Sequence, residues 1–201
     1  MKYHLSLDIA FKKNPHKGLY IALEGIDGSG KTTQSTALKE FFTTKGKNVT
    51  QTSEPRVDLP GGELIMQFFK GEVAVSGQAF QYWMSANRVI NHDEIVVPAL
   101  KRGEVVISDR CFWSAVPYGL MDNGVSFERK DAEIMMVTQG LLSHYYQFIA
   151  PDIVIYIDIN SDTGLERSLA KKGRRETDVY EKKDKLAKVV KGYRWLVKSF
   201  P

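Results

Sequence analysis

Residues 25–32 read GIDGSGKT and lie one residue after the apolar run LYIAL. The motif matches Gly-x-x-x-x-Gly-Lys-Thr, whose glycines permit a tight loop with backbone N–H groups that point at phosphate oxygens. In such a loop Lys31 reaches the outer phosphates, Thr32 is a ligand of Mg²⁺, and the following helix adds the positive end of its dipole. The motif therefore predicts a strand, a phosphate-binding loop and a helix, with a nucleoside triphosphate as ligand.

The bulk composition is that of one domain with an adequate core, since 43% of the 201 residues are hydrophobic. No stretch approaches the ~18 apolar residues that a membrane span needs, so we expect no membrane partner. Cys111 is the only cysteine, which rules out an internal disulfide. A reducing, cytoplasmic location is the plain expectation.

The positive charge of the chain is local. Residues 166–191 hold ten Lys/Arg against five Asp/Glu, whereas the rest of the chain is nearly neutral. A nucleic-acid binder would more often show a broad basic face, so we expect no nucleic-acid partner. The basic segment fits a flap over phosphates, and a solvated charged helix is the alternative.

Apolar strands alternate with helical patterns along the chain, which predicts an α/β fold with a parallel sheet and helices on both faces. We expect strands at residues 19–24, 48–53, 104–108 and 153–157, the last two buried, and helices at 31–45, 78–101, 131–149, 162–171 and 180–199. Residues 3–11 alternate between apolar and polar side chains, the signature of a half-buried strand. We therefore divide the chain into an N-terminal extension, 1–17, and a nucleotide-binding domain, 18–201.

Polar residues follow several of the predicted strands, at the sheet edge where ligands of open α/β sheets bind. They are Asp27 in the loop, Glu54, Asp109 with Arg110, and Asp158. Asp109 is in the context of an acid that orients Mg²⁺ or its waters, although it could instead cap the next turn. Arg110 could hold an acceptor phosphate through bidentate bonds.

Arg88 lies in an apolar helical stretch, and a guanidinium there needs an anionic or carbonyl partner. The partner could be a ligand or a core carboxylate, and the sequence leaves both open.

In these motifs the chain resembles the thymidylate kinase family of P-loop nucleoside-monophosphate kinases. The resemblance covers residues 19–198 and rests on EGIDGSGKTTQ, SEP, SANR, PALKRGEVVISDR and PDIVIYIDI, which begin at Glu24, Ser53, Ser85, Pro98 and Pro151. It implies a three-layer α/β/α P-loop kinase fold. It also implies phosphoryl transfer from ATP, with Mg²⁺, to a small-molecule acceptor, a deoxynucleoside monophosphate and above all dTMP.

The resemblance also implies roles for single residues. It places ATP on Gly25, Gly28, Ser29, Gly30, Lys31, Thr32 and Thr33, with Arg167 stacked on adenine, and Mg²⁺ on Thr32 and Asp109. It places the acceptor on Asp27, Glu54, Pro55, Arg56, Met84, Arg88, Asp109, Arg110, Ser114 and Tyr118. Of these, Arg88 would bond the pyrimidine edge, and Arg110 would lie at the acceptor phosphate.

Some members of the family carry a basic residue in the phosphate loop, while others carry glycine there and supply an arginine from a lid. This chain has Gly28, so the resemblance implies that Arg174 or Arg175, in a lid at about residues 171–181, closes over the transferring group. Catalysis would then rest on Lys31, Asp27, Arg110 and this lid arginine, without a dedicated general base.

This chain departs from the family pattern at the acceptor site, so the sequence leaves open a dTMP kinase and two alternatives. Met84 stands where the family has a phenylalanine that stacks on thymine, and Trp83 or Tyr82 could compensate. The alternatives to a dTMP kinase are a kinase for another deoxynucleotide or deoxynucleoside, and a catalytically weak P-loop nucleotide-binding module.

Relatives form dimers through helices that flank the sheet, and residues 78–101 and 131–149 are apolar enough for a homodimer of this kind. Relatives also continue with a last strand and helix beyond Pro201. We expect residues 3–11 to take the place of that edge strand.

Overall fold

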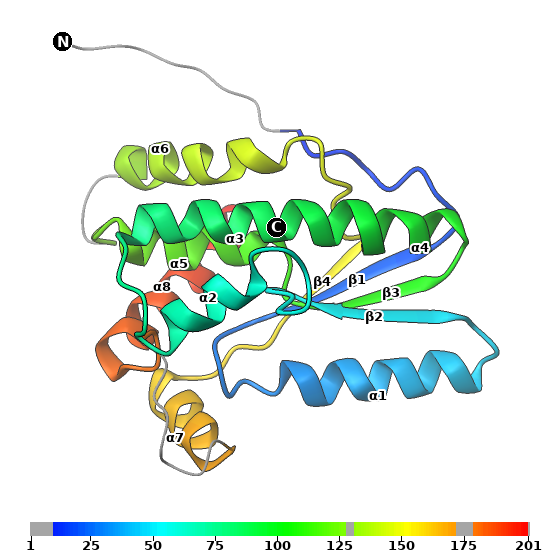
Figure 1. Cartoon of the computed structure of the whole chain (residues 1–201), viewed down its shortest axis with the longest axis horizontal. Coiled ribbons are helices and arrows are strands. Elements are labelled where there is room, and N and C mark those ends of the chain that lie inside the picture. Colours follow the sequence, from blue (N-terminus) through cyan, green and yellow to red (C-terminus); the bar gives the residue numbers. More distant parts are fainter. Residues whose placement is uncertain (1–9, 128–130, 172–178, 201) are drawn as a thin grey trace.

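The structure is a computed structural model that describes residues 10–127, 131–171 and 179–200 (Figure 1). Its elements are, in chain order, β1 (Leu19–Glu24), α1 (Lys31–Thr44), β2 (Val49–Ser53), α2 (Gly62–Phe69), α3 (Gly77–Asn91), a π-helical turn (His92–Val96), α4 (Val97–Lys101), β3 (Val105–Asp109), a 3₁₀ turn (Phe112–Ser114), α5 (Ala115–Asp122), α6 (Asp131–Leu142), a second 3₁₀ turn (Ser143–Tyr145), β4 (Ile153–Tyr156), α7 (Ser161–Lys171) and α8 (Lys183–Ser199).

In the described part of the chain, four parallel strands form one sheet in the order β2-β3-β1-β4. The chain leaves β1 toward β2 and leaves the neighbouring β3 toward β4, so the two connections run in opposite directions along the sheet. A crevice opens at such a point beyond the carboxyl ends of the strands. The phosphate loop follows β1 and Asp109-Arg110 follows β3, so both predicted binding segments lie at this crevice.

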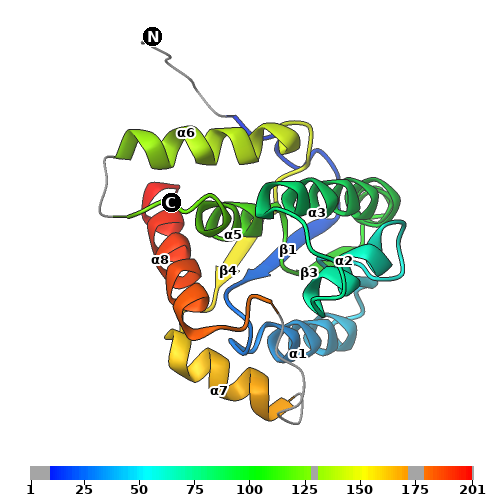
Figure 2. The same cartoon turned by 60° about the vertical axis from the view of Figure 1, so that its left-hand side comes forward.

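Helices cover both faces of the sheet, which confirms the predicted three-layer α/β/α fold (Figures 1 and 2). On one face, Leu38 and Phe42 of α1 pack on a buried cluster that includes Ile21 and Ile107. On the other face, Tyr20 and Val106 pack against residues of the π turn and α4.

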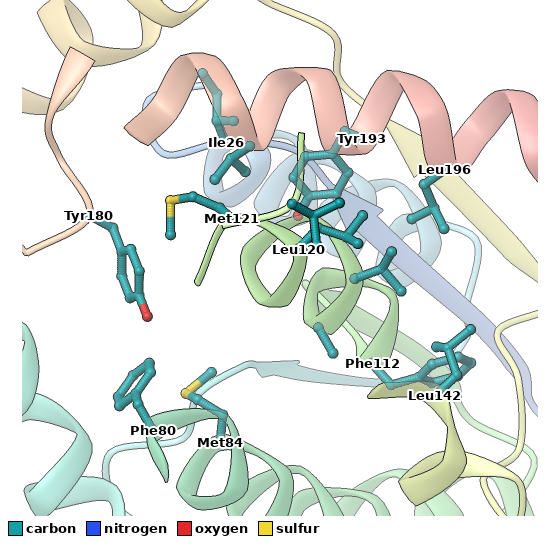
Figure 3. Close-up of a cluster of buried hydrophobic side chains, with 14 of the residues drawn as sticks. Ile26, Phe80, Met84, Phe112, Leu120, Met121, Leu142, Tyr180, Tyr193 and Leu196 are labelled. Carbon is teal, nitrogen blue, oxygen red and sulfur yellow. The ribbon is translucent and has the colours of Figure 1, made fainter. Parts of the chain in front are cut away.

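The largest apolar cluster lies beyond the second face, among the helices (Figure 3). It includes Phe80 and Met84 of α3, Leu120 of α5, Leu142 of α6, and Tyr193 and Leu196 of α8. Burying each such side chain contributes about 1.5–3 kcal/mol. Because these helices enclose one wall of the crevice, the core that stabilises the fold also builds the binding site. No helix in the described ranges is both long and apolar enough to cross a membrane.

All four strands predicted within residues 18–201 are present, but the last differs in its environment. We expected the strand at 153–157 to be buried, and this was wrong: Ile153, Val154 and Ile155 of β4 are 38–46% exposed. β4 is the outer strand of the described sheet, whereas α1 packs on β1, β2 and β3. An apolar run alone does not distinguish a central strand from an edge strand.

The predicted helices differ from the observed ones mainly at their ends. The helix expected over 78–101 is one continuous run of α3, the π turn and α4. The helix expected over 131–149 is too long, because α6 ends at Leu142 and the chain then turns so that Tyr145 and Phe148 are buried. The helix expected from residue 180 begins at Lys183, since Tyr180 and Glu181 first pack into the interior.

Two helices, α2 and α5, were not predicted. α5 is apolar on nearly every side because α3, α6 and α8 surround it, so it lacks the one-sided pattern that identifies a surface helix. Gly119 permits this packing, since a Cβ there would lie 2.5 Å from a methyl group of Leu141.

The strand predicted over residues 3–11 falls almost wholly on residues 1–9, which lie outside the described residues. Ala10 and Phe11 belong to no strand, and Lys12 forms an isolated parallel bridge with Ile149. The Phe11 ring stacks on Phe112, with ring centres 5.2 Å apart. The edge-strand hypothesis and the division at residue 17 therefore stay predictions.

Candidate active site

The phosphate loop has the backbone that its sequence requires. Gly28 and Gly30 adopt positive φ values of 75° and 99°, and Lys31 is the first residue of α1. This left-handed backbone makes an anion-binding nest at a helix N-terminus. The Ser29 hydroxyl is buried without a hydrogen-bond partner among the described residues, as expected of a group that would donate to a phosphate oxygen.

Gly28 packs directly on α7. A Cβ at this position would lie 2.1 Å from the carbonyl oxygen of Gly164, and the positive φ would strain any other residue. The loop therefore has no room for a side chain here. This supplies a physical reason for the inference that the loop contributes no arginine.

Lys31 is nearly enclosed, with 6% of its surface exposed, and its Nζ donates to the carbonyl oxygen of Ile26 at 2.9 Å. Burial, and next the charge of Arg110, lower the pKa of Lys31 to about 8. A bound anion would compensate the ammonium group for the solvent that it has lost.

Thr32 and Asp109 meet at the crevice. The Thr32 hydroxyl donates to Oδ2 of Asp109 at 2.7 Å, which joins the start of α1 to the end of β3. The described residues contain no group of three or more His, Cys, Asp or Glu arranged to hold a metal ion. One hydroxyl and one carboxylate nevertheless fit Mg²⁺, which proteins commonly bind through one or two carboxylates together with substrate phosphates.

Arg110 is the most connected side chain of the site. Its Nη1 donates to the Gly25 carbonyl oxygen at 2.9 Å and to the Tyr193 hydroxyl at 3.1 Å. Its Nη2 donates to Asp27 at 2.8 Å and to the Tyr118 hydroxyl at 3.0 Å. Burial by itself would lower the pKa of Arg110, but Tyr118 and Asp27 more than offset it and the pKa lies well above its ordinary value.

Glu24 holds residues that contact Arg110, a role that the motif did not reveal. Its carboxylate is 2% exposed and accepts hydrogen bonds from the Ser114 hydroxyl at 2.6 Å and the Tyr193 hydroxyl at 2.7 Å. The Cys111 backbone N–H donates to it as well, at 2.9 Å. Glu24 begins the motif EGIDGSGKTTQ, so a signal existed, whereas nothing in the sequence pairs it with Tyr193 of α8.

Arg88 has the core carboxylate partner that the sequence left open. Its Nε donates to Glu54 at 3.0 Å, and each side chain is 3% exposed. Burial raises the pKa of Glu54 to about 7, against the opposing charge of Arg88. The pairing with Glu54 does not prevent Arg88 from contacting a ligand, because Arg88 also lines the large cavity of the site.

A cavity of about 850 Å³ brings most of the predicted site residues together. Those that line it are Asp27, Gly28, Ser29, Gly30, Lys31, Thr32, Thr33, Glu54, Pro55, Met84, Arg88, Asp109, Arg110, Ser114, Tyr118 and Arg167. The lining thus combines the phosphate loop with Met84 and Arg88 of α3. The volume suits an elongated ligand or two ligands in line.

Two predicted residues do not line the cavity. Gly25 lies behind the loop, where its carbonyl oxygen accepts from Arg110. The Arg56 guanidinium is bound by Asp58, two residues on. Arg174 and Arg175 lie outside the described residues, but Lys171 and Tyr180 on either side of that segment both line the cavity.

The aromatic wall of the cavity was not predicted. We suggested Trp83 or Tyr82 as a substitute for the phenylalanine absent at Met84, and neither lines the cavity. Tyr82 is 54% exposed and stacks on His144 at 5.4 Å. The rings that do line it, besides Tyr118, are Phe69, Phe80 and Tyr180.

Comparison with known proteins now decides between nucleotide-binding families. A family model described as thymidylate kinase matches residues 23–201. The chain belongs to the thymidylate kinase family.

Individual thymidylate kinases support this assignment. That of Thermoanaerobacter sp. (strain X514) is 32% identical over 187 residues, 92% of this chain and 86% of that protein. The probable thymidylate kinase of Pyrococcus horikoshii is 42% identical over 107 residues, 51% of this chain and 52% of that protein. The solved structure of thymidylate kinase from Candida albicans has a TM-score of 0.70 at 24% identity, covers 89% of this chain and 77% of that chain, and shows the same fold.

The packing of α7 on the phosphate loop can be tested with Gly164→Ala. The new Cβ would lie 2.8 Å from the Asp27 carbonyl oxygen, so the loop must shift. We expect the free energy of unfolding to fall by about 1–3 kcal/mol and the Kd for ATP to rise. The control is Gly140→Ala in α6, where a Cβ meets open space and helix propensity should stabilise by about 0.5–1 kcal/mol. Equal ATP affinity for wild type and Gly164→Ala would contradict the account.

The pKa of Lys31 predicts how ATP affinity depends on pH. Because this pKa is lowered to about 8, the free protein loses the ammonium charge as pH rises above 8. We expect the Kd for ATP, measured by calorimetry from pH 7.5 to 9.5, to be constant at first and then to rise by up to about tenfold per pH unit. Lys31→Met should bind weakly with no such rise. A flat wild-type profile across this range would exclude the assigned pKa.

Proposed function

We propose that this protein transfers the γ-phosphoryl group of ATP to dTMP, giving ADP and dTDP. One observation carries the proposal: a single cavity runs from a phosphate loop to two buried arginines, Arg110 and Arg88. Membership in the thymidylate kinase family supports the choice of dTMP as acceptor. The two phosphate chains would then meet over the loop.

On the donor side, the amides of residues 28–32 would hold the β- and γ-phosphates while Lys31 neutralises their charge. Arg167 of α7 lines the same cavity, and we assign it to the adenine ring. Thr32 and Asp109 would hold Mg²⁺, which would supply positive charge to offset the negative charge of the phosphates.

On the acceptor side, Arg110 would bind the dTMP phosphate, and its many anchors keep it in place before the substrate arrives. Asp27 orients that guanidinium and lies beside the acceptor sugar. The pyrimidine would lie along α3, with Met84 against the ring and Nη2 of Arg88 donating to a base carbonyl. Pre-organisation of this kind lowers the entropy that binding costs.

Catalysis would consist of positioning and charge neutralisation. The acceptor phosphate is already an anionic nucleophile, so the reaction needs no general base. Since the backbone at Gly28 excludes a side chain, we propose that Arg174 or Arg175 supplies the positive charge on the transferring group.

A coupled assay over dTMP, dCMP, dGMP and the deoxynucleosides tests the proposed acceptor. We expect the highest kcat/KM for dTMP and no turnover of nucleosides, because these lack the anion that Arg110 binds. Equal or faster turnover of dCMP or dGMP would remove the thymine assignment. An absence of any turnover, with ATP binding that depends on Lys31, would favour a nucleotide-binding module.

The lid assignment predicts the behaviour of the double variant Arg174→Ala/Arg175→Ala. Loss of an arginine that contacts the transferring group should lower kcat by about 10³-fold or more. The control is Lys183→Ala, which removes a neighbouring exposed cation that pairs with Asp162. A double variant with near wild-type kcat would show that the catalytic charge comes from elsewhere.

We also propose a homodimer and a cytoplasmic location. Tyr82 of α3 is 54% exposed and Met136 of α6 is 70% exposed, on two helices that lie side by side (Figure 1). Such exposed apolar groups suit an interface between copies. Sedimentation at twice 22.8 kDa would support the dimer, and a monomer at micromolar concentration would exclude it.

Cell fractionation tests the proposed cytoplasmic location, which the lone Cys111 supports.

A further inference from the structure

Arg88 can recognise a base only if its guanidinium plane is fixed. The group is planar with five N–H donors, so a single anchor would leave it free to rotate. The first anchor is the bond from Nε to Glu54, 3.0 Å long and buried. This contact sets the position of the guanidinium but not which donor faces the cavity.

Tyr145 supplies the second anchor. Nη1 of Arg88 donates to the Tyr145 hydroxyl at 3.1 Å, and the guanidinium carbon lies 5.9 Å from the centre of the Tyr145 ring. The tyrosine side chain is fully buried. Two of the five N–H donors are then engaged, and Nη2 has no hydrogen bond to any residue that the structure describes.

The direction of the hydrogen bonds around Tyr145 follows from their partners. The Ser85 hydroxyl donates to the Gln81 carbonyl oxygen at 2.8 Å, which uses its only proton. With that proton assignment the tyrosine is the donor in the 2.7 Å contact between Tyr145 and Ser85, and Nδ1 of His144 also lies 3.3 Å from the Ser85 oxygen. The tyrosine oxygen is then an acceptor for Arg88. A continuous chain of hydrogen bonds thus runs from Nη1 of Arg88 through Tyr145 and Ser85 to the backbone of α3.

Tyr145 reaches Arg88 only because α6 ends early. The residue lies in the 3₁₀ turn Ser143–Tyr145, in the stretch where the sequence predicted continued helix. None of the family motifs in this sequence includes it. Burial by itself would lower the pKa of Arg88, and the contacts with Tyr145 and Glu54 more than offset it, so the arginine stays charged.

We propose that Tyr145 is a positioning residue for acceptor recognition: by accepting from Nη1 it turns Nη2 of Arg88 toward the base carbonyl at C4 of thymine. The inference rests on the proposed function, because it assumes a pyrimidine monophosphate in the cavity. Cytosine carries an amino donor at C4, and a fixed N–H donor opposes it. Tyr145 therefore contributes to the preference for dTMP over dCMP without touching either nucleotide.

The experiment is steady-state kinetics of Tyr145→Phe with dTMP, dCMP and ATP. Phenylalanine keeps the ring and removes only the acceptor for Nη1. We expect the KM for dTMP to rise about tenfold, the loss typical of one hydrogen bond to a charged group, with kcat within about threefold. The KM for ATP should stay unchanged, and the dTMP-to-dCMP ratio of kcat/KM should fall. A merely structural role would lower the melting temperature without changing this ratio.

Two further variants sharpen the test. Ser85→Ala removes the acceptor that orients the tyrosine proton, so it should raise the KM for dTMP by a smaller factor and add nothing in the Tyr145→Phe background. Tyr146→Phe is the matched control and should leave all constants unchanged, because among the described residues the Tyr146 hydroxyl accepts only from Gln139, on the surface.

The outcomes separate the two proposals. If the wild type phosphorylates no deoxynucleoside monophosphate, the proposed function fails. If it phosphorylates dTMP while Tyr145→Phe keeps the wild-type KM and dTMP-to-dCMP ratio, only the role of Tyr145 is overturned. If Tyr145→Phe does not fold, Ser85→Ala decides, and an unchanged KM and ratio there overturn the inference.

Discussion

The buried guanidinium of Arg110 is the interaction on which the site depends. It joins the phosphate loop after β1, the end of β3, α5 and α8 through Gly25, Asp27, Tyr118 and Tyr193. Arg110 itself has a positive φ of 75°, a conformation that costs of order 1–3 kcal/mol in a non-glycine residue. Burial of the charge adds to this cost. The contacts of the packed surroundings offset both costs. The cation is therefore fixed beside the loop before any ligand binds.

A second buried cation, Arg88, also lines the cavity. It is held by Glu54 from the end of β2 and by Tyr145 from the turn after α6. The two arginines thus depend on different elements, and the sheet together with the large helical core fixes their separation. In the proposed function, this frame would hold the acceptor phosphate at Arg110 and the base at Arg88. It also explains why residues far from the motifs, such as Tyr193 and Tyr145, affect the site.

The sequence predicted the parts of the molecule whose determinants are local. The phosphate loop, the four strands and the site positions of Arg110 and Arg88 follow from residues next to one another in the chain. The parts that it missed depend on distant contacts: α6 ends where Tyr145 turns to Arg88, and α8 starts late because Tyr180 packs into the cavity. α5 was not predicted because it is buried on nearly all sides and therefore lacks the helical alternation of apolar and polar residues. Arg56 pairs with its neighbour Asp58, which no pattern indicated, and its role at the acceptor stays a prediction.

A crystal structure with dTMP and a non-hydrolysable ATP analogue tests the central claim most directly. The account predicts that the dTMP phosphate lies within hydrogen-bonding distance of Arg110, with the ATP phosphates over residues 28–32 and the thymine carbonyl on Nη2 of Arg88. Arg110 and Arg88 should keep their positions on Asp27 and Glu54. A complex in which the dTMP phosphate binds away from Arg110, or in which either arginine must leave its anchors to admit the ligand, would contradict the account.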